Sequence, residues 1–194
     1  MLPIVNRGVL RSNPFLDDGG VAECYAIARQ SSGRYVTTGY GAATAKNGTS
    51  SYGYQSSTAQ DLISVGFTPS GTAVDQSFGI RGTRVIQSEE LVGLSSSEDR
   101  GRDVLVLDDD RIVHAGRLGP NPALFVVEPD GGYDTSNNVG QAFTYAPLGA
   151  TLNPVVPTSH FYRVVLSKDG KRIAATTNNH VEGVLLAVLQ VGDP

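Results

Sequence analysis

Three histidines are the side chains of this sequence best suited to acid–base chemistry: His114, His160 and His180. An imidazole beside a carboxylate can move protons near neutral pH, so His114 or His160 with nearby carboxylates would suit a hydrolase or lyase. The three are not spaced as zinc ligands, and no serine lies in the GxSxG motif of a hydrolase. We therefore assign no catalytic residue and expect a buried or rim position for His114.

The densest group of carboxylates is the run Asp108, Asp109 and Asp110. Carboxylate oxygens suit Ca²⁺, but consecutive side chains point in different directions, and a calcium loop spaces its ligands and contains a glycine. We therefore expect a hairpin turn here and no metal site. The glycine-rich motifs that bind phosphate are absent from the sequence, so no cofactor is expected either.

Residues 41–60 consist almost entirely of Gly, Ala, Ser, Thr, Asn, Gln and Tyr. Such a segment buries little apolar surface, so we predict an insertion loop, 40–60, that projects from the first part of the fold. Tyr40, Tyr52 and Tyr54 supply amphipathic contacts beside adaptable polar residues, a combination typical of binding loops. The alternative is a surface excursion without a binding role.

An internal repeat indicates how these residues are positioned. Moved forward without a gap, residues 102–131 fall on residues 163–192. Moved backward, residues 102–116 fall on residues 25–39. A fixed self-similarity of this kind is typical of repeat architectures.

Each copy contains short apolar runs separated by Gly, Asp, Ser and Pro, a pattern of strands and turns. The segments SSGR, DDDR and DGKR lie between two runs and predict hairpin turns. With an orphan strand at Arg7–Leu10, we predict three antiparallel four-stranded units in one repeat domain, 1–194, with approximate bounds 7–67, 81–127 and 140–191. The predicted hairpins are Tyr25–Thr38, Asp103–Ala115 and Val164–Thr176, the third strands Leu62–Phe67, Ala123–Val127 and Val184–Leu189, and the fourth strands Thr83–Ile86 and Ala142–Tyr145.

Four-stranded units in tandem indicate the blades of a β-propeller. The stretches FTPSGTAVDQSFGIRG (Phe67–Gly82) and VHAG with FVVEPDGGYDTS (within Val113–Ser136) resemble the delta-60 repeat of bacterial propeller-like proteins. The second copy departs from that pattern at Asn137 and Asn138, where the family has Phe-Gly. The resemblance implies a propeller-like fold and an exported, cell-surface setting, and it carries over no reaction or catalytic residue.

Three blades leave two exposed sheet edges, whereas propellers close with about four to eight blades. We therefore expect two copies to pair as a homodimer and form a six-bladed ring with twofold symmetry. The alternative is closure with a second repeat chain or with more of a longer polypeptide.

Composition limits the partners. The chain has 15 Lys and Arg, 19 Asp and Glu, and a formal net charge of −4. Its basic residues are scattered, which argues against nucleic-acid binding. No apolar run is long enough to predict a membrane span, the N-terminal residues lack the features of a signal peptide, and the single cysteine, Cys24, forms no internal disulfide and leaves the compartment open.

These patterns together predict a non-catalytic interaction or scaffold module that binds a protein or glycan through its loop face. The alternative is a hydrolase or lyase with a site at the central channel, built from His114 or His160 and nearby carboxylates. A channel where histidine and carboxylate converge would favour the enzyme.

Overall fold

The computed structural model describes residues 10, 12–15, 20–42, 60–87, 98–119, 121–132, 143–144, 160–179 and 183–190. Strands and turns account for the regular structure of these residues, and the described part of the chain contains no helix. Consequently no described helix is long and apolar enough to cross a membrane. The chain is all-β, as the sequence predicts.

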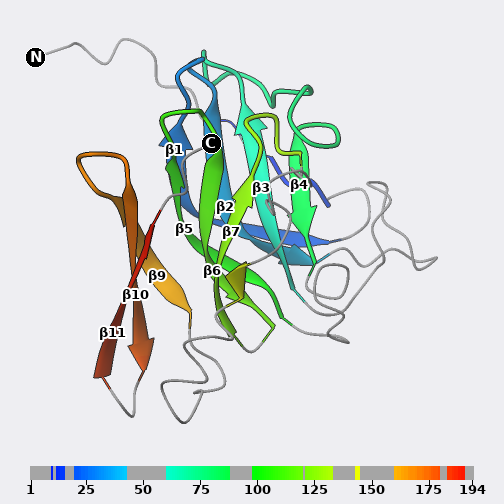
Figure 1. Cartoon of the computed structure of the whole chain (residues 1–194). Coiled ribbons are helices and arrows are strands. Elements are labelled where there is room, and N and C mark those ends of the chain that lie inside the picture. The colour runs from blue at the N-terminus through cyan, green and yellow to red at the C-terminus, as the bar shows by residue number, and fades with distance from the viewer. Residues whose placement is uncertain are drawn as a thin grey trace, which may run out of the picture.

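The strands form three antiparallel sheets, and within each sheet the strands follow one another in chain order (Figure 1). The first sheet consists of β1 (Val21–Arg29), β2 (Tyr35–Ala42), β3 (Asp61–Phe67) and β4 (Thr83–Ile86). The second consists of β5 (Arg100–Val106), β6 (Ile112–Leu118), β7 (Asn121–Val127) and β8 (Phe143–Thr144). The third consists of β9 (Phe161–Leu166), β10 (Arg172–Asn179) and β11 (Gly183–Gln190).

The predicted hairpins and third strands are confirmed, and the predicted fourth strands appear as β4 and β8. The boundary that bears on the predicted binding loop was wrong: β2 continues to Ala42, so Tyr40 belongs to a strand and not to the insertion loop. Residues 43–59 of that loop, with Tyr52 and Tyr54, lie outside the described residues, as does the predicted orphan strand Arg7–Leu10 except for Leu10.

The hairpin turns use one left-handed residue each. Gly33, Asp110 and Gly170 have φ angles of 89°, 66° and 71°, a region that favours glycine. The third turn is longer: Leu107 N–H donates to Arg111 O in the second sheet, whereas Ser167 N–H donates to Arg172 O, five positions on instead of four, in the third. The gap-free alignment was therefore wrong before this turn.

The first strand of every sheet contains a β-bulge at an equivalent position. The pairing with the neighbouring strand skips Tyr25 in β1, Arg102 in β5 and Tyr162 in β9. A bulged residue has no partner in the ladder and its side chain is re-aimed. Arg102 therefore corresponds to Tyr162, and not to Arg163 as the gap-free alignment had it.

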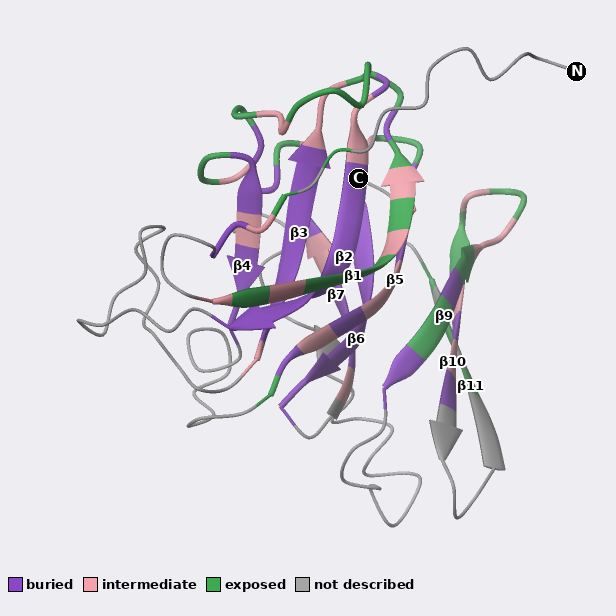
Figure 2. Ribbon diagram, turned by 180° about the vertical axis from the view of Figure 1, so that it is seen from behind, coloured by how far each residue is buried: buried purple, intermediate pink, exposed green. Residues whose placement is uncertain are grey.

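The sheets pack face to face through two apolar cores. Val36, Leu62 and Ile86 of the first sheet meet Ile112 and Phe125 of the second. The second core joins the second and third sheets; it is built from Leu107, Val113, Ala115, Leu124, Phe161, Val164, Ile173 and Ala175. Figure 2 shows the result: β2, β3 and β6 are buried along most of their length, whereas exposed stretches lie on the first strands β1 and β9.

Candidate functional site

The three bulge residues come together in one cluster. The guanidinium carbon of Arg102 lies 4.5 Å from the ring centroid of Tyr25 and 5.8 Å from that of Tyr162. A third ring, that of Tyr40, lies 5.7 Å from the same carbon. Each distance is within the range of a cation–π interaction. We call these four residues, with Glu23 and Arg100, the tyrosine–arginine cluster.

Glu23 orients two of the tyrosines. The hydroxyls of Tyr25 and Tyr40 donate to its Oε2 atom over 3.0 and 2.9 Å, and the two rings stack with centroids 5.5 Å apart. These hydrogen bonds, Tyr40's first, lower the pKa of Glu23, with the charges of Arg100 and Arg102 adding to the effect. The hydrogen bond with Tyr25, burial and the bond to Glu23 raise the pKa of Tyr40. Glu23 is therefore an anion and the Tyr40 hydroxyl keeps its proton near neutral pH.

The two arginines of the cluster differ in their partners. Arg100 lies over the Tyr40 ring at 4.8 Å, and its Nη2 atom bonds Glu98 over 2.9 Å. Arg117 also pairs with Glu98. Arg102, by contrast, makes no hydrogen bond or ion pair with any residue that the structure describes, and its Nε atom is buried.

Sequence reasoning found only part of this cluster. Tyr40 is in it, but on a strand and not at a loop tip. Tyr25, Arg102 and Tyr162 were missed because the gap-free alignment put Arg102 opposite Arg163. Allowing one extra residue in the third hairpin turn would have placed the three bulge residues in register.

His114 lies deep between the first and second sheets, with none of its surface exposed. It pairs in register with Val104 and Phe125, and neither ring nitrogen has a hydrogen-bond partner among the described residues. Burial lowers its pKa to about 3, so the ring is neutral at ordinary pH. This position offers neither solvent access nor a carboxylate partner for acid–base chemistry.

The other histidines do not add a catalytic pair. His160 is buried with its ring tilted against Tyr162, the centroids 5.4 Å apart. His180 lies outside the described residues. No group of three or more His, Cys, Asp or Glu among the described residues is arranged to hold a metal ion.

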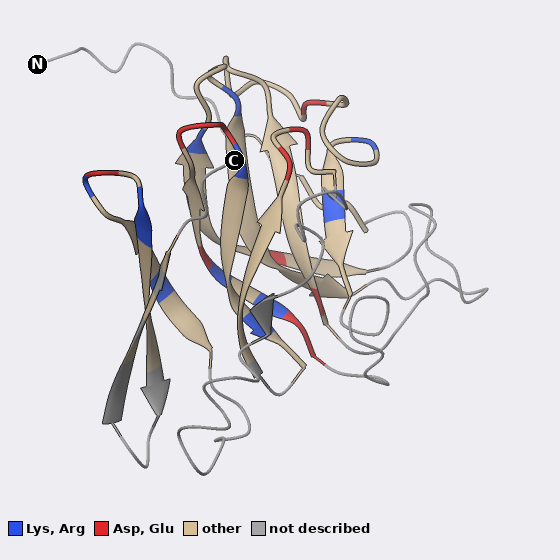
Figure 3. Cartoon of the chain, viewed as in Figure 1, with Lys and Arg blue, Asp and Glu red and all other residues tan. Residues whose placement is uncertain are grey.

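The carboxylates singled out in the sequence serve turns. Asp109 accepts from the backbone N–H of Arg111, and Asp110 accepts from Ser31 N–H over 2.7 Å in the neighbouring sheet. Asp75 accepts from the N–H and hydroxyl of Ser77 over 3.0 and 2.6 Å, as the turn interpretation predicts. Its proposed counterparts, Asp134 and Ser136, are outside the described residues. Figure 3 shows acidic residues at several turns, with charges of both signs distributed over the sheets.

Each sheet has a leading face toward the preceding sheet and a trailing face toward the following one. On the first strands, Val104 and Val164 lie on leading faces and are buried in the two cores. Ala28 and Leu105, on trailing faces, pack against the same cores. The same pair of positions therefore makes both internal contacts.

At the ends of the stack these positions are uncovered in the described structure. Ile27, equivalent to Val104, is 62% exposed on the first sheet. On the third sheet Val165, equivalent to Leu105, is 60% exposed, and Leu186 and Val188, on the same face but across β10 from it, are 64% and 57% exposed. We call Val165, Leu186 and Val188 the open face.

The leading face of the first sheet is partly covered by the chain itself. Phe15 is fully buried and packs with Ile63 and Val85. Gly41 makes room for it, because a Cβ atom there would lie 2.7 Å from the Phe15 ring. Phe15 thus covers one part of this face, beside Ile63 and Val85, and Ile27 lies exposed on another part.

No protein-family model matches the chain, and no curated protein sequence is similar to it. The resemblance to the delta-60 repeat stays a prediction, and function has to be argued from the geometry.

Proposed function

We propose that the chain is a non-catalytic interaction module of the β-propeller type, related to the delta-60 repeat, and that it pairs with a second copy of itself through the open face. The three sheets would then act as blades around a common axis. One observation carries this proposal: the open face exposes apolar side chains at positions whose equivalents pack against the apolar cores of the internal contacts.

The repeat supports the choice of the open face. Leu124 and Val126 hold the positions on β7 that Leu186 and Val188 hold on β11, and they pack into the core between the second and third sheets. A third sheet built in the same way should bury its trailing face against another sheet. Exposed apolar side chains that cluster on one face are a recognised feature of interaction surfaces.

The repeat also favours a second copy as the occupant. At both internal contacts the following sheet contributes a β-branched residue, Val104 or Val164, from its first strand. Ile27 is the equivalent residue on the first sheet, and it is exposed. Two copies related by a twofold axis would make this contact twice and close a ring of six sheets.

Phe15 weakens that contact without removing it. Because Phe15 fills the part of the leading face next to Ile63 and Val85, an incoming open face meets Ile27 directly but has to displace Phe15 to reach the rest. Burying three aliphatic side chains that are already partly covered contributes about 3–5 kcal/mol per contact. This only partly offsets the cost of association, so we expect reversible pairing that depends on concentration.

Light scattering over a concentration series tests the proposal. The wild-type chain should approach twice its mass of 20.4 kDa as concentration rises. Leu186→Lys, which places a charge on the open face, should remain monomeric. The matched control is Ile80→Lys, an exposed apolar residue of the connection between β3 and β4 away from the open face, which should pair like wild type. A wild-type chain that stays monomeric throughout contradicts pairing between copies.

The alternative of a hydrolase or lyase gains no support from the described residues. His114 is neutral, fully buried and without a carboxylate partner among them, and His160 is packed against Tyr162. Binding of a protein or glycan at the loop face stays part of the proposal.

A further inference from the structure

We infer that the tyrosine–arginine cluster is a binding site for a carboxylate, with Arg102 as its central contact. All the residues involved belong to one chain, so the site does not depend on the pairing of copies proposed above. Its first support is position. Arg102 lies between Tyr25 and Tyr162, so the first strands of all three sheets contribute to it.

The guanidinium of Arg102 contacts aromatic rings but has no hydrogen-bond acceptor among the described residues. A guanidinium has five N–H donors, all in its own plane. The rings of Tyr25, Tyr40 and Tyr162 attract the cation, but ring faces offer no lone pairs for those donors. No hydrogen bond or ion pair joins Arg102 to a described residue, and its Nε atom is shielded from solvent. The terminal nitrogens of Arg102 are not among the buried atoms, so an acceptor from outside can reach these unpaired charged donors.

The nearby carboxylates are engaged elsewhere. Glu23 accepts both tyrosine hydroxyls at its Oε2 atom, and it forms no ion pair with Arg102. Glu98 pairs with Arg100 and Arg117. Among the arginines of the cluster, Arg102 is therefore the one without an ion pair to a described residue, and the charge of Glu23 acts on it only through space.

The tyrosines make the site accessible and rigid. Tyr25 and Tyr162 flank Arg102 and are 46% and 41% exposed, so a ligand can approach between them. The hydrogen bonds to Glu23 fix the Tyr25 and Tyr40 rings, which in turn fix the guanidinium plane. A planar carboxylate matches the fork of a guanidinium with two parallel hydrogen bonds, a geometry that an ammonium group does not reproduce.

Calorimetric titration of the full chain tests this inference with three probes: a hexaglutamate peptide, a hexaglutamine peptide and malonate. We expect hexaglutamate to bind and hexaglutamine not to bind. Competition by malonate distinguishes a small free carboxylate from an acidic peptide segment as the source of the group. Binding of both carboxylate probes, or of hexaglutamate alone, supports the site.

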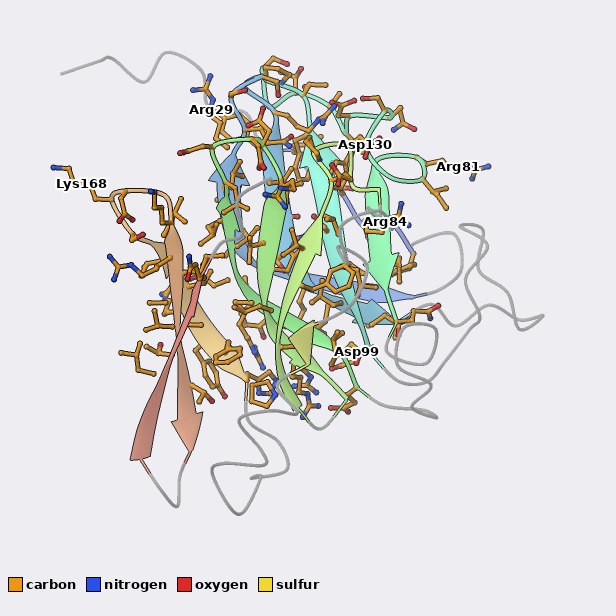
Figure 4. All side chains as sticks on the ribbon, viewed as in Figure 1. Arg29, Arg81, Arg84, Asp99, Asp130 and Lys168 are labelled. Carbon is orange, nitrogen blue, oxygen red and sulfur yellow. The ribbon has the colours of Figure 1, made fainter. Side chains whose placement is uncertain are left out.

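Two substitutions separate the site from general charge attraction. Arg102→Lys keeps the positive charge and loses the fork, and we expect binding of hexaglutamate to weaken about tenfold or more. The matched control is Arg29→Lys: Arg29 also lies over a tyrosine ring, Tyr35, at 5.9 Å, but at the turn end of β1 (Figure 4), and its loss should leave binding unchanged.

NMR of the Arg102 side chain supplies a readout that does not require a variant to fold. Adding malonate or hexaglutamate to wild type should shift the Nε–H resonance of Arg102 and saturate with the calorimetric binding curve. Equal binding by wild type and Arg102→Lys, equal shifts at Arg29, or no carboxylate binding at all would each overturn the inference. None of these outcomes depends on whether the chain is a monomer or a dimer, so they leave the self-association proposal to its own test.

Discussion

At the scale of single residues, His114 is the clearest case of a side chain whose role follows from its surroundings. It stands where the other sheets have Thr37 and Ala175, and that uniqueness made it a candidate site residue. In the structure its ring lies in an apolar core with both nitrogens unpaired among the described residues. A buried polar group without partners destabilises a fold by about 1–3 kcal/mol.

Replacing His114 with leucine should therefore raise the free energy of unfolding by about 1–3 kcal/mol at neutral pH. Urea unfolding of both proteins measures the difference. A loss of stability would instead show that the ring has a partner that compensates for its burial.

The same residue predicts how stability depends on pH. In the unfolded chain a histidine takes up its proton near pH 6.5, whereas folded His114 has a pKa of about 3. Below pH 6.5 the unfolded state binds the extra proton, so the free energy of unfolding falls by about 1.4 kcal/mol per pH unit until the folded pKa is reached. His114→Leu should remove this part of the slope between pH 6 and about 4 in urea titrations. Identical slopes for both proteins would contradict it.

At the scale of elements, the hairpin turns show how one repeated residue serves different roles. Arg34, Arg111 and Arg172 hold equivalent positions after the three turns. Among the described contacts Arg34 alone connects several segments: its Nε atom lies 2.7 Å from Asp75, and its Nη1 atom donates to Pro129 O in the turn after β7. Arg172, the equivalent residue of the third sheet, makes a weaker ion pair, because it is largely exposed and lies 3.5 Å from Asp169.

Arg34→Met should consequently lower the free energy of unfolding by about 1–3 kcal/mol, since it removes the charged donor to Asp75 Oδ2 and one of the two donors to the Pro129 carbonyl. The control is Arg172→Met, the same substitution at the equivalent position, which should change stability little. Thermal or urea unfolding measures both.

The pH dependence adds a check on Asp75. Hydrogen bonds from Ser77 and Arg34 lower its pKa in the folded state, so they stabilise the fold above the ordinary aspartate pKa and this contribution is lost as pH falls through the lowered value. In Arg34→Met the acid-induced loss should be smaller. If the free energy of unfolding falls equally with pH in wild type and Arg34→Met, Arg34 contributes nothing to this ionisation.

The elements also show what the sequence could and could not predict. Short apolar runs and turn residues are local signals, and the strands Tyr35–Ala42 and Phe161–Leu166 were located to within a few residues by them. Tyr25, Arg102 and Tyr162 meet only because three bulges are in register, and a single extra residue in one turn hides that register in a gap-free comparison. Tyr40 was singled out because tyrosine is common in binding loops, but the sequence did not predict that it lies on a strand.

At the scale of the whole molecule, the contact of Phe15 with the first sheet is not foreseeable from any repeat. Phe15 lies outside the aligned stretches of the repeat, and its partners Ile63 and Val85 are far from it in the sequence. Its effect, however, is on the very face that the repeat would offer to another sheet.

Removing this cover should promote pairing. Phe15→Ala frees the surface beside Ile63 and Val85, and we expect its dimer to form at lower concentration than that of wild type, as measured by light scattering. Weaker pairing than wild type would indicate that Phe15 supports the contact surface instead of competing for it.

The half-covered leading face also bears on how such a molecule avoids uncontrolled growth. A stack whose two ends match each other can in principle add copies without limit and form a filament, as open head-to-tail contacts do. In this chain the leading face of the first sheet is partly covered, because Phe15 occupies part of the surface that an incoming sheet would contact. If copies pair as proposed, each incoming copy has to displace that side chain, and we expect this to oppose the growth of fibres.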